Sequence, residues 1–245
     1  MRNLLVINPN TSASVSALLH GHALRLVGAQ ATVRTVTARF GAPYIACEAS
    51  YAVAGHAVLD AWAQAQADQS EPFDAVLIAC FGDPGLLALR ESSAAPVTGL
   101  AEAAFTESAK TGRFAVVTGG ARWKPMLERL AHGLGFGAQL AGIVTVAQSG
   151  AELARDPKAA EAILSNACRQ AVDQFGAASV ILGGAGLAGL AERIQPKLKV
   201  PVIDSVLAGI GHALNLPAPS PNDNRPFDFK WTNVSSELAA LGNDA

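Results

Sequence analysis

The sequence lacks the features that mark membrane, secreted and nucleic-acid-binding proteins. It has only three cysteines, without paired spacing, which argues against a disulfide framework and a cysteine-based zinc site. No apolar run approaches the roughly 20 residues of a membrane span, and no basic cluster accompanies the net charge of −2. We therefore expect no nucleic-acid and no membrane partner. Because the chain enters a strand pattern without a signal peptide, we expect a cytoplasmic location.

Charged residues are also scarce, at 16%, whereas half of the residues are hydrophobic. This balance is typical of a compact enzyme-like protein and not of a disordered one. A chain of 245 residues can form one large domain or two small ones with a substantial core. The five histidines have no mutual spacing such as HxxxH, so we predict no metal site.

One cysteine lies where a strand pattern meets a glycine-rich turn. The apolar run Ala75–Ala79 predicts a buried parallel strand, Cys80 follows it, and the turn Phe81–Gly85 leads into a helix that begins at Pro84 or Gly85. Open α/β sheets bind ligands at this edge, and a helix N-terminus lowers a thiol pKa and stabilises anions. The alternative is that Cys80 is only a small core residue. We interpret Cys47 and Cys168, which lack such turns, as packing residues.

The same pattern occurs twice in the chain. The segment 180–187 is again a strand, a turn of small residues and a helix start, with the helix predicted to span 187–198, and aligning the two repeats sets Gly184 against Cys80. The motif at 96–101 recurs at 201–206, and residues 4–9 correspond to 114–119. The repeat predicts an α/β fold of two pseudo-symmetric domains, each a mainly parallel sheet flanked by helices, with a cleft between them. We place one domain at residues 1–100 plus 207–245 and the other at 101–206.

Polar side chains follow the first strand of each repeat. Asn8, Asn10 and Thr11 come at the end of the strand Arg2–Asn8, where they could contact a polar substrate beside Cys80 or, for Thr11 with Ser12, simply cap a helix. Thr118 is the counterpart of Asn8, with the same two interpretations. The other candidate substrate contacts lie in the turns after the strands: Phe81, Gly82, Gly119, Gly183 and Ala185.

Six motifs in order resemble the Asp/Glu racemase superfamily, and most closely its hydantoin and allantoin racemases. They are INPNTS (7–12), ACFGDPGL (79–86), PVTGLAEAA (96–104), VVTGG (116–120), LGGAGLAGL (182–190) and PVIDSV (201–206). The resemblance spans the chain up to the tail. It implies cofactor-independent proton transfer in an interdomain cleft, with Cys80 as the first catalytic cysteine. Asn10, Thr11 and the turn after Cys80 match its substrate-binding loops. The expected partner is a small molecule, namely a hydantoin, an amino-acid derivative or a small carboxylate, and we also expect a homo-oligomer.

In that family the second cysteine motif resembles LGCAGM, and the sequence departs from it. Here the motif is LGGAGL, so Gly184 stands where the second catalytic cysteine is expected. Glycine has no proton to give, and losing such a group typically slows a reaction by roughly 100- to 10,000-fold. Three hypotheses remain. The chain is a racemase that is either impaired or helped by water or another residue; Asp204 and Ser205 are the nearby candidates, although the pattern favours a strand-end cap for both. It is a one-thiol lyase resembling the arylmalonate decarboxylases, or it is a non-catalytic binder of a small carboxylate or ureide.

The C-terminal part has a different composition. Residues 216–229 are rich in Pro, Asn and Ser and lack periodicity, which predicts an extended tail. A short helix is expected around 235–241. Whether the tail covers the core or forms a dimer contact stays open at this point.

Overall fold

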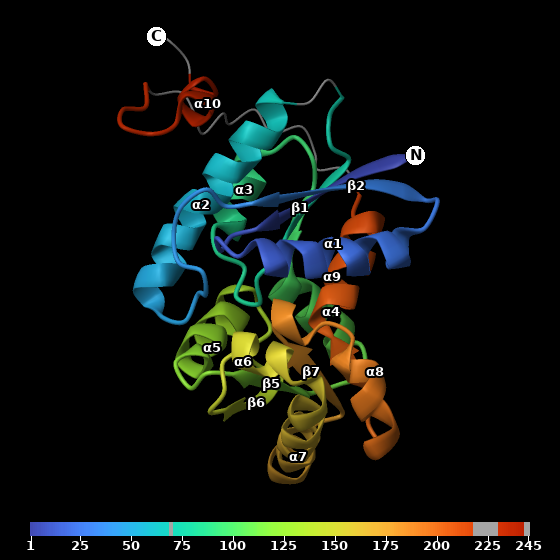
Figure 1. Ribbon diagram of the computed structural model, residues 1–245. Helices are drawn as coiled ribbons and strands as arrows, with labels where there is room; N and C mark the ends of the chain where they lie inside the picture. The colour runs from blue at the N-terminus through green and yellow to red at the C-terminus, as the bar shows by residue number, and fades with distance from the viewer. Residues whose placement is uncertain (69–70, 218–229, 243–245) are drawn as a thin grey trace.

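The computed structural model in Figure 1 describes residues 1–68, 71–217 and 230–242. In the N-terminal half the elements are β1 (Arg2–Asn8), α1 (Ala13–Val27), β2 (Ala31–Thr37), α2 (Glu48–Ala67), β3 (Ala75–Ile78), α3 (Leu86–Ser92), β4 (Val97–Gly99) and α4 (Leu100–Ala109). The second half contains β5 (Phe114–Gly119), α5 (Trp123–Gly133), β6 (Leu140–Val146), α6 (Gly150–Arg155), α7 (Pro157–Phe175) and β7 (Ser179–Gly183). It continues with η1 (Ala185–Leu187), α8 (Leu190–Ile194), η2 (Gln195–Lys197), β8 (Val202–Asp204) and α9 (Ser205–Asn215), and α10 (Ser236–Ala239) lies in the tail.

The strands form two parallel four-stranded sheets of identical topology. One has the order β2-β1-β3-β4 and the other β6-β5-β7-β8, so each sheet is built in the same way from its own half of the chain. Strands β1, β3, β5 and β7 occupy the central positions and are almost entirely buried, as the continuous apolar runs in their sequences predict. The predicted α/β fold with two similar sheets flanked by helices is confirmed.

The two halves share one apolar core. Helices α4 and α9 pack against each other, and α9 also contacts α1, β3 and β4 of the first half. Figure 1 shows these two helices between the upper and lower halves. A single buried cluster runs from Leu4 and Leu77 through Phe105 and Ile210 to Phe114. Because this core crosses the boundary, it fixes how the two sheet edges face each other.

Local signals explain most of the helix boundaries. Ser12 caps α1, since its Oγ accepts a hydrogen bond from the Val15 N–H. Helix α1 ends at Gly28, whose φ of 51° is a backbone conformation that suits glycine. Helix α3 begins at Leu86, slightly later than predicted, because Gly85 adopts a left-handed conformation.

The single helix predicted for residues 187–198 is wrong. The chain instead forms the short turn η1, then α8, then η2. Gly189, with a φ of 83°, separates η1 from α8, and Pro196 lies in η2. A left-handed glycine and a proline each interrupt the regular helical hydrogen-bond pattern, which periodicity alone did not reveal.

The tail helix α10 packs against α2, where Leu238 is buried, and it lies inside the predicted range 235–241. Arg39 joins the tail to the first half, because its guanidinium binds both carboxylate oxygens of Asp60 and one of Glu237. The stretch predicted to be extended, 216–229, lies almost wholly outside the described residues.

No helix in the described part of the chain is long and apolar enough to cross a bilayer.

Candidate active site

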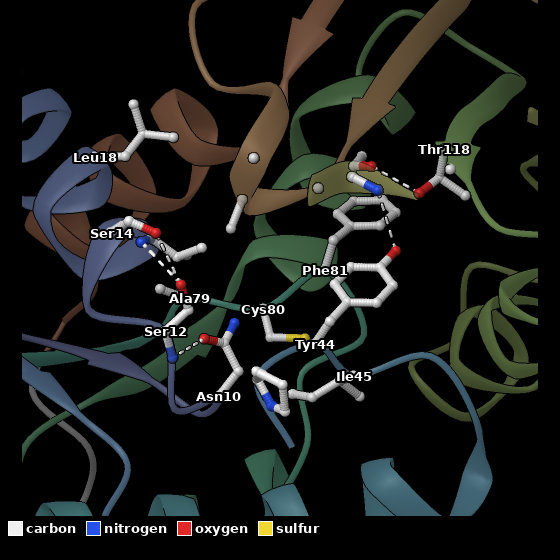
Figure 2. Close-up of a pocket in the computed structure, with 18 of the residues that line it drawn as sticks. Asn10, Ser12, Ser14, Leu18, Tyr44, Ile45, Ala79, Cys80, Phe81 and Thr118 are labelled. Atoms are coloured by element: carbon white, nitrogen blue, oxygen red, sulfur yellow. Dashed lines mark hydrogen bonds between the residues drawn. The ribbon is translucent and has the colours of Figure 1, made fainter. Parts of the chain in front are cut away.

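A cavity of about 660 Å³ is lined by residues from both halves. The N-terminal half contributes Asn10, Ser12, Ser14, Val15, Leu18, Pro43, Tyr44, Ile45, Ala79, Cys80 and Phe81. The other half contributes Thr118, Gly119, Trp123, Gly150, Arg155, Gly183, Gly184, Ala185 and Gly186. Figure 2 shows the loop of Asn10 and Ser12, the Cys80 sulfur and the Tyr44 ring around this space. The volume lies within the range typical of small-molecule sites.

The strand registers place Cys80 and Gly184 at equivalent points of the two sheets. Ile78 of β3 is paired with Ile7 of β1, and Cys80 follows two residues later. In the second sheet Leu182 pairs with Val117 in the same way, and Gly184 follows two residues later. The alignment of the two repeats therefore corresponds to a real structural equivalence. One position carries a thiol and the other carries only backbone.

Cys80 is nearly buried, with 8% of its surface exposed, yet it lines the cavity. Burial raises the pKa of its thiol well above the ordinary range, and the nearby Asp83 carboxylate adds to this effect. The sequence-based expectation of a lowered pKa is therefore wrong in direction. Helix α3 does not start until Leu86, whose N–H is already donated to the Asp83 carbonyl, so the helix N-terminus does not offset the burial.

The turn after Cys80 is fixed by Asp83. The Asp83 N–H donates to the Cys80 carbonyl oxygen over 3.1 Å, and its carboxylate accepts from the N–H groups of Ala101 (2.9 Å) and Glu102 (2.7 Å). Asp83 thus caps α4 from another segment of the chain. Gly99 makes room for it, because a Cβ there would lie 2.1 Å from the Asp83 carboxyl carbon. Sequence reasoning missed this role, although the acid stood between two glycines of the turn.

Asp83 has a φ of 51°, an uncommon conformation for a residue with a side chain. Its burial raises the pKa of the carboxyl to about 7. On the other side of the turn, the Tyr51 hydroxyl donates to the Gly82 carbonyl oxygen over 2.8 Å. Burial, followed by Asp83 and Cys80, raises the pKa of Tyr51 to about 12, so this phenol remains a neutral donor. The Cys80 turn is therefore held rigidly from two directions.

The Gly184 turn is held in a different way. The Gly184 N–H donates to the Ser205 Oγ over 3.2 Å, and the Gly189 N–H donates to an Asp204 carboxylate oxygen over 2.7 Å. Gly184 has a φ of 144°, a conformation that side-chain-bearing residues rarely adopt. A Cβ there would contact only Leu187, at 3.4 Å. Space for a side chain therefore exists at this position, but the backbone conformation disfavours one.

Of the residues predicted to bind substrate, six line the cavity together with Cys80 and Gly184. They are Asn10, Phe81, Thr118, Gly119, Gly183 and Ala185. Asn8, Thr11 and Gly82 lie outside this lining. Asn8 is fully buried, and its amide donates to Asn10 Oδ1, so it positions the loop beneath the cavity. The Thr11 N–H donates to the Ala42 carbonyl oxygen, which ties that loop to the segment before Tyr44.

Several lining residues were missed from the sequence. Tyr44 lies in the loop between β2 and α2, and its Oη accepts a hydrogen bond from the Gly150 N–H of the other half over 3.3 Å. Arg155, at the end of α6, is the one charged side chain among the described lining residues. Trp123 adds an apolar surface. An aromatic residue in the loop 41–45 was a weak signal, because nothing local shows what such a loop faces.

The described residues contain no group of three or more His, Cys, Asp or Glu side chains arranged to hold a metal ion. The side chains available around the cavity are instead a thiol, a phenol, an arginine, several hydroxyls and an amide. These groups can transfer protons and form hydrogen bonds to a polar small molecule. The aromatic and aliphatic surface of Val15, Leu18, Ile45 and Phe81 would exclude water from part of it.

Comparison with known proteins gives consistent matches over most of the chain. The sequence model of the Asp/Glu/Hydantoin racemase family matches residues 4–213. The chain is 30% identical over 239 residues to the hydantoin racemase of Pseudomonas sp. strain NS671, covering 97% of this chain and 95% of that protein. It is 33% identical over 216 residues to the hydantoin racemase of Paenarthrobacter aurescens, covering 88% and 91%.

Solved structures agree with these matches. The allantoin racemase from Klebsiella pneumoniae superposes with a TM-score of 0.86 at 30% identity, covering 99% of both chains. An arylmalonate decarboxylase structure superposes with a TM-score of 0.59 at 18% identity, covering 87% of this chain and 92% of that chain. At that identity the second similarity concerns the fold alone.

Proposed function

Because the chain belongs to the Asp/Glu/hydantoin racemase family and is an isomerase of the racemase type, we propose that Cys80 is its proton-transfer group. We further propose that the substrate is a hydantoin or a related amino-acid derivative. The observation that carries the proposal is that the Cys80 sulfur lines the cavity at the strand end of the first sheet. The relatives named hydantoin racemase and allantoin racemase support the choice of a cyclic ureide.

The reaction needs a carbon acid, and a hydantoin supplies one. Its C5–H lies between a carbonyl group and a nitrogen, so the electron pair left by deprotonation is delocalised into the carbonyl as an enolate. The Cys80 thiolate takes the proton and becomes a thiol, and reprotonation on the opposite face of the carbon gives the other enantiomer. The amide of Asn10 and the hydroxyls of Ser12 and Thr118 are the polar groups available to orient such a ring.

The electrostatics of the site set a pH dependence. Burial, with a contribution from Asp83, raises the pKa of Cys80, so the resting form is the thiol. The thiol can give a proton to an enolate, whereas the thiolate needed to remove one is a minor species at neutral pH. Proton abstraction by Cys80 is therefore expected to rise with pH through the alkaline range.

A second candidate reaction is decarboxylation by a single thiol. The observation that favours it is the replacement of the second thiol by Gly184, which leaves Cys80 as the one thiol in the lining. A decarboxylase needs only one proton, delivered to one face of the enolate that remains after CO2 departs. Such an enzyme would give a single enantiomer of its product.

Labelling in D2O separates these functions. Each enantiomer of 5-benzylhydantoin and of allantoin, and 2-methyl-2-phenylmalonate as the decarboxylase probe, is incubated with the protein in D2O. A racemase incorporates deuterium at the stereocentre and converts either enantiomer to the mixture. A decarboxylase releases CO2 from 2-methyl-2-phenylmalonate and leaves one enantiomer of 2-phenylpropionate labelled at its α-carbon. If the protein is only a binder, the ligand raises the melting temperature of the protein and no carbon is labelled. The absence of both racemisation and deuterium exchange with every ureide tested would overturn the proposal.

Replacing Cys80 tests its role. Cys80→Ala is expected to lower the exchange rate by about 100- to 10,000-fold. Cys168→Ala is the matched control, because Cys168 is also buried but belongs to a core cluster of the second half and is outside the cavity lining. Exchange that continues at the original rate in Cys80→Ala would show that another group moves the proton.

A further inference from the structure

We propose that Tyr44 is the second proton-transfer group, whose phenol supplies on the side of the second half the proton that Gly184 cannot supply. This inference rests on the proposed function of Cys80. It answers the question that the glycine raises, namely which group protonates the enolate on the face away from the thiol. Nothing in the motifs of the sequence assigns a role to this residue.

The position of the phenol is the first argument. Tyr44 belongs to the first half, but its Oη accepts from the Gly150 N–H at the start of α6. Cβ atoms built on Gly120 and on Gly150 would each lie 3.9 Å from this oxygen. The hydroxyl therefore lies against the wall formed by the second half, while the side chain lines the cavity. Figure 2 shows it directed toward Thr118 and away from the Cys80 sulfur.

The hydrogen-bonding state of the phenol is the second argument. Because Oη accepts from Gly150, this contact leaves the hydroxyl hydrogen unused. No acceptor among the described residues takes that hydrogen. A phenol that is oriented through its oxygen while its proton remains available is arranged as a general acid.

The other hydroxyls of the lining are already engaged. Thr118 donates its proton to the Gly183 carbonyl oxygen over 2.8 Å. Ser12 Oγ caps α1 and shares a hydrogen bond of 3.0 Å with Ser14. Aliphatic hydroxyls are also much weaker acids than a phenol, and they are not among the usual general acids of enzymes.

Arg155 is excluded for a different reason, because a guanidinium stays protonated at all ordinary pH values. A phenol, by contrast, can donate its proton and, as a phenolate, can accept one, which the two directions of racemisation require. Among the described lining residues, Tyr44 is therefore the side chain best suited to work with Cys80.

The proposed step balances without any co-reactant. The Cys80 thiolate removes the proton from carbon, the C–H pair moves into the enolate, and the Tyr44 O–H gives its proton to the opposite face. The products are the inverted substrate, a thiol and a phenolate. The other enantiomer follows the reverse path, in which the phenolate abstracts the proton and the thiol donates it. Solvent exchange restores the starting protonation states.

Tyr44→Phe removes only the proton donor, so it separates inversion from exchange. The probe is each enantiomer of 5-benzylhydantoin in D2O, followed by chiral chromatography with mass spectrometry. In the wild type both enantiomers exchange and invert. In Tyr44→Phe we expect inversion to fall by at least 100-fold. The enantiomer whose hydrogen faces Cys80 should still exchange with retention, within about threefold of the wild-type rate, while the other enantiomer should stop exchanging.

Tyr51→Phe is the matched comparison, since it also removes one phenol hydroxyl, but from the support of the Cys80 turn. It should lower exchange and inversion in equal proportion. A purely structural role for Tyr44 would give that same equal loss in Tyr44→Phe and would overturn the proposal, as would unchanged inversion. If Tyr44→Phe does not fold, Tyr44→His provides the test, because its imidazole should restore inversion with a pH profile moved to lower pH.

The two proposals fail in distinguishable ways. Both assignments are supported if Tyr44→Phe still exchanges one enantiomer and Cys80→Ala no longer exchanges it. A wild-type protein that exchanges one enantiomer with retention and inverts neither overturns the role of Tyr44 and leaves Cys80 in place. Exchange that is independent of Cys80 overturns the proposed function itself.

Discussion

The two halves of the molecule share one topology but differ in the turn that ends the third strand of each sheet. In the first half the turn carries Cys80 and is held by the side chains of Asp83 and Tyr51. In the second half it carries Gly184 and is held through its own N–H by Ser205. The halves therefore provide a common frame, while the chemistry depends on a few side chains at one strand end.

The acids that cap the following helices show the same divergence. Asp204 ends β8 and caps α9 directly, accepting from the Val206 N–H over 2.9 Å. The equivalent position at the end of β4 is Gly99, and Asp83 reaches in from the preceding turn to cap α4. Asp204 is thus a local cap of α9, whereas Asp83 caps α4 from the turn that also carries the thiol. This difference explains why a carboxyl lies beside Cys80 and raises its pKa.

The largest expected effect comes from restoring the symmetry. Gly184→Cys would place a second thiol at the position equivalent to Cys80, with only Leu187 in contact. We expect inversion to rise, and to become independent of Tyr44 in the double variant Gly184→Cys, Tyr44→Phe. The φ of 144° should lower the free energy of unfolding by about 1–3 kcal/mol.

Gly184→Ala is the control for Gly184→Cys, since it introduces the same backbone strain without a thiol. It should be destabilised to a similar degree and should not invert substrate faster. Thermal unfolding and chiral assays on both variants make the comparison. Equal activities of the two variants would show that the wall at Gly184 does not reach the reacting carbon.

Asp83→Asn is expected to have an intermediate effect. Removing the negative charge should lower the pKa of Cys80, so the alkaline rise of exchange moves to lower pH. An amide offers one acceptor oxygen to the two N–H groups of Ala101 and Glu102, which should lower the free energy of unfolding by about 1–3 kcal/mol. The pH–rate profile and urea unfolding test the two effects separately. A profile that does not move would show that burial alone sets the thiol pKa.

The same carboxyl predicts a pH dependence of stability. Its pKa is about 7 in the folded protein and 3.8 as the ordinary value. A raised folded pKa means that its contribution to stability is fully present below about pH 4 and is lost as the pH rises through 7. Unfolding free energies across this window should therefore decline less steeply in Asp83→Asn than in the wild type. Parallel curves would contradict the raised pKa of Asp83.

The smallest effect is expected from Ser205→Ala. This change removes the acceptor for the Gly184 N–H and should lower the free energy of unfolding by about 0.5–1.5 kcal/mol. Exchange at the Cys80 face should stay unchanged, since Ser205 is outside the cavity lining. Loss of exchange in this variant would show that the Gly184 turn takes part in the step assigned to Cys80.

Much of the architecture could be predicted from the sequence because it follows from local patterns. The apolar runs of the central strands and the repeated turn motifs predicted two similar α/β halves, and the strand registers reproduce the alignment of Cys80 with Gly184. The split of the helix predicted at 187–198 was missed, since it occurs at the left-handed Gly189, whose N–H donates to the carboxylate of Asp204 from a later strand. Such a contact has no periodic signature.

The parts of the site that could not be predicted depend on contacts between distant segments. Tyr44 reaches Gly150, and Asp83 reaches Ala101 and Glu102, through the way the elements pack. The predicted direction of the Cys80 pKa shift was wrong. Burial, which raises this pKa, is a property of the whole fold, whereas the helix-terminus argument used only the neighbouring sequence. Sequence patterns therefore indicated where the thiol lies but not its protonation state.

The central claim, that one thiol in the cavity carries the chemistry, can be tested by alkylating it. Samples treated with iodoacetamide at several pH values are analysed by peptide mass spectrometry and, in parallel, for exchange at the carbon of 5-benzylhydantoin. We expect the loss of exchange to follow alkylation of Cys80 and to be slowed by the hydantoin. The alkylation rate should increase at a higher pH than it does for an ordinary thiol. A sample in which Cys80 is fully alkylated and exchange is undiminished would contradict the claim.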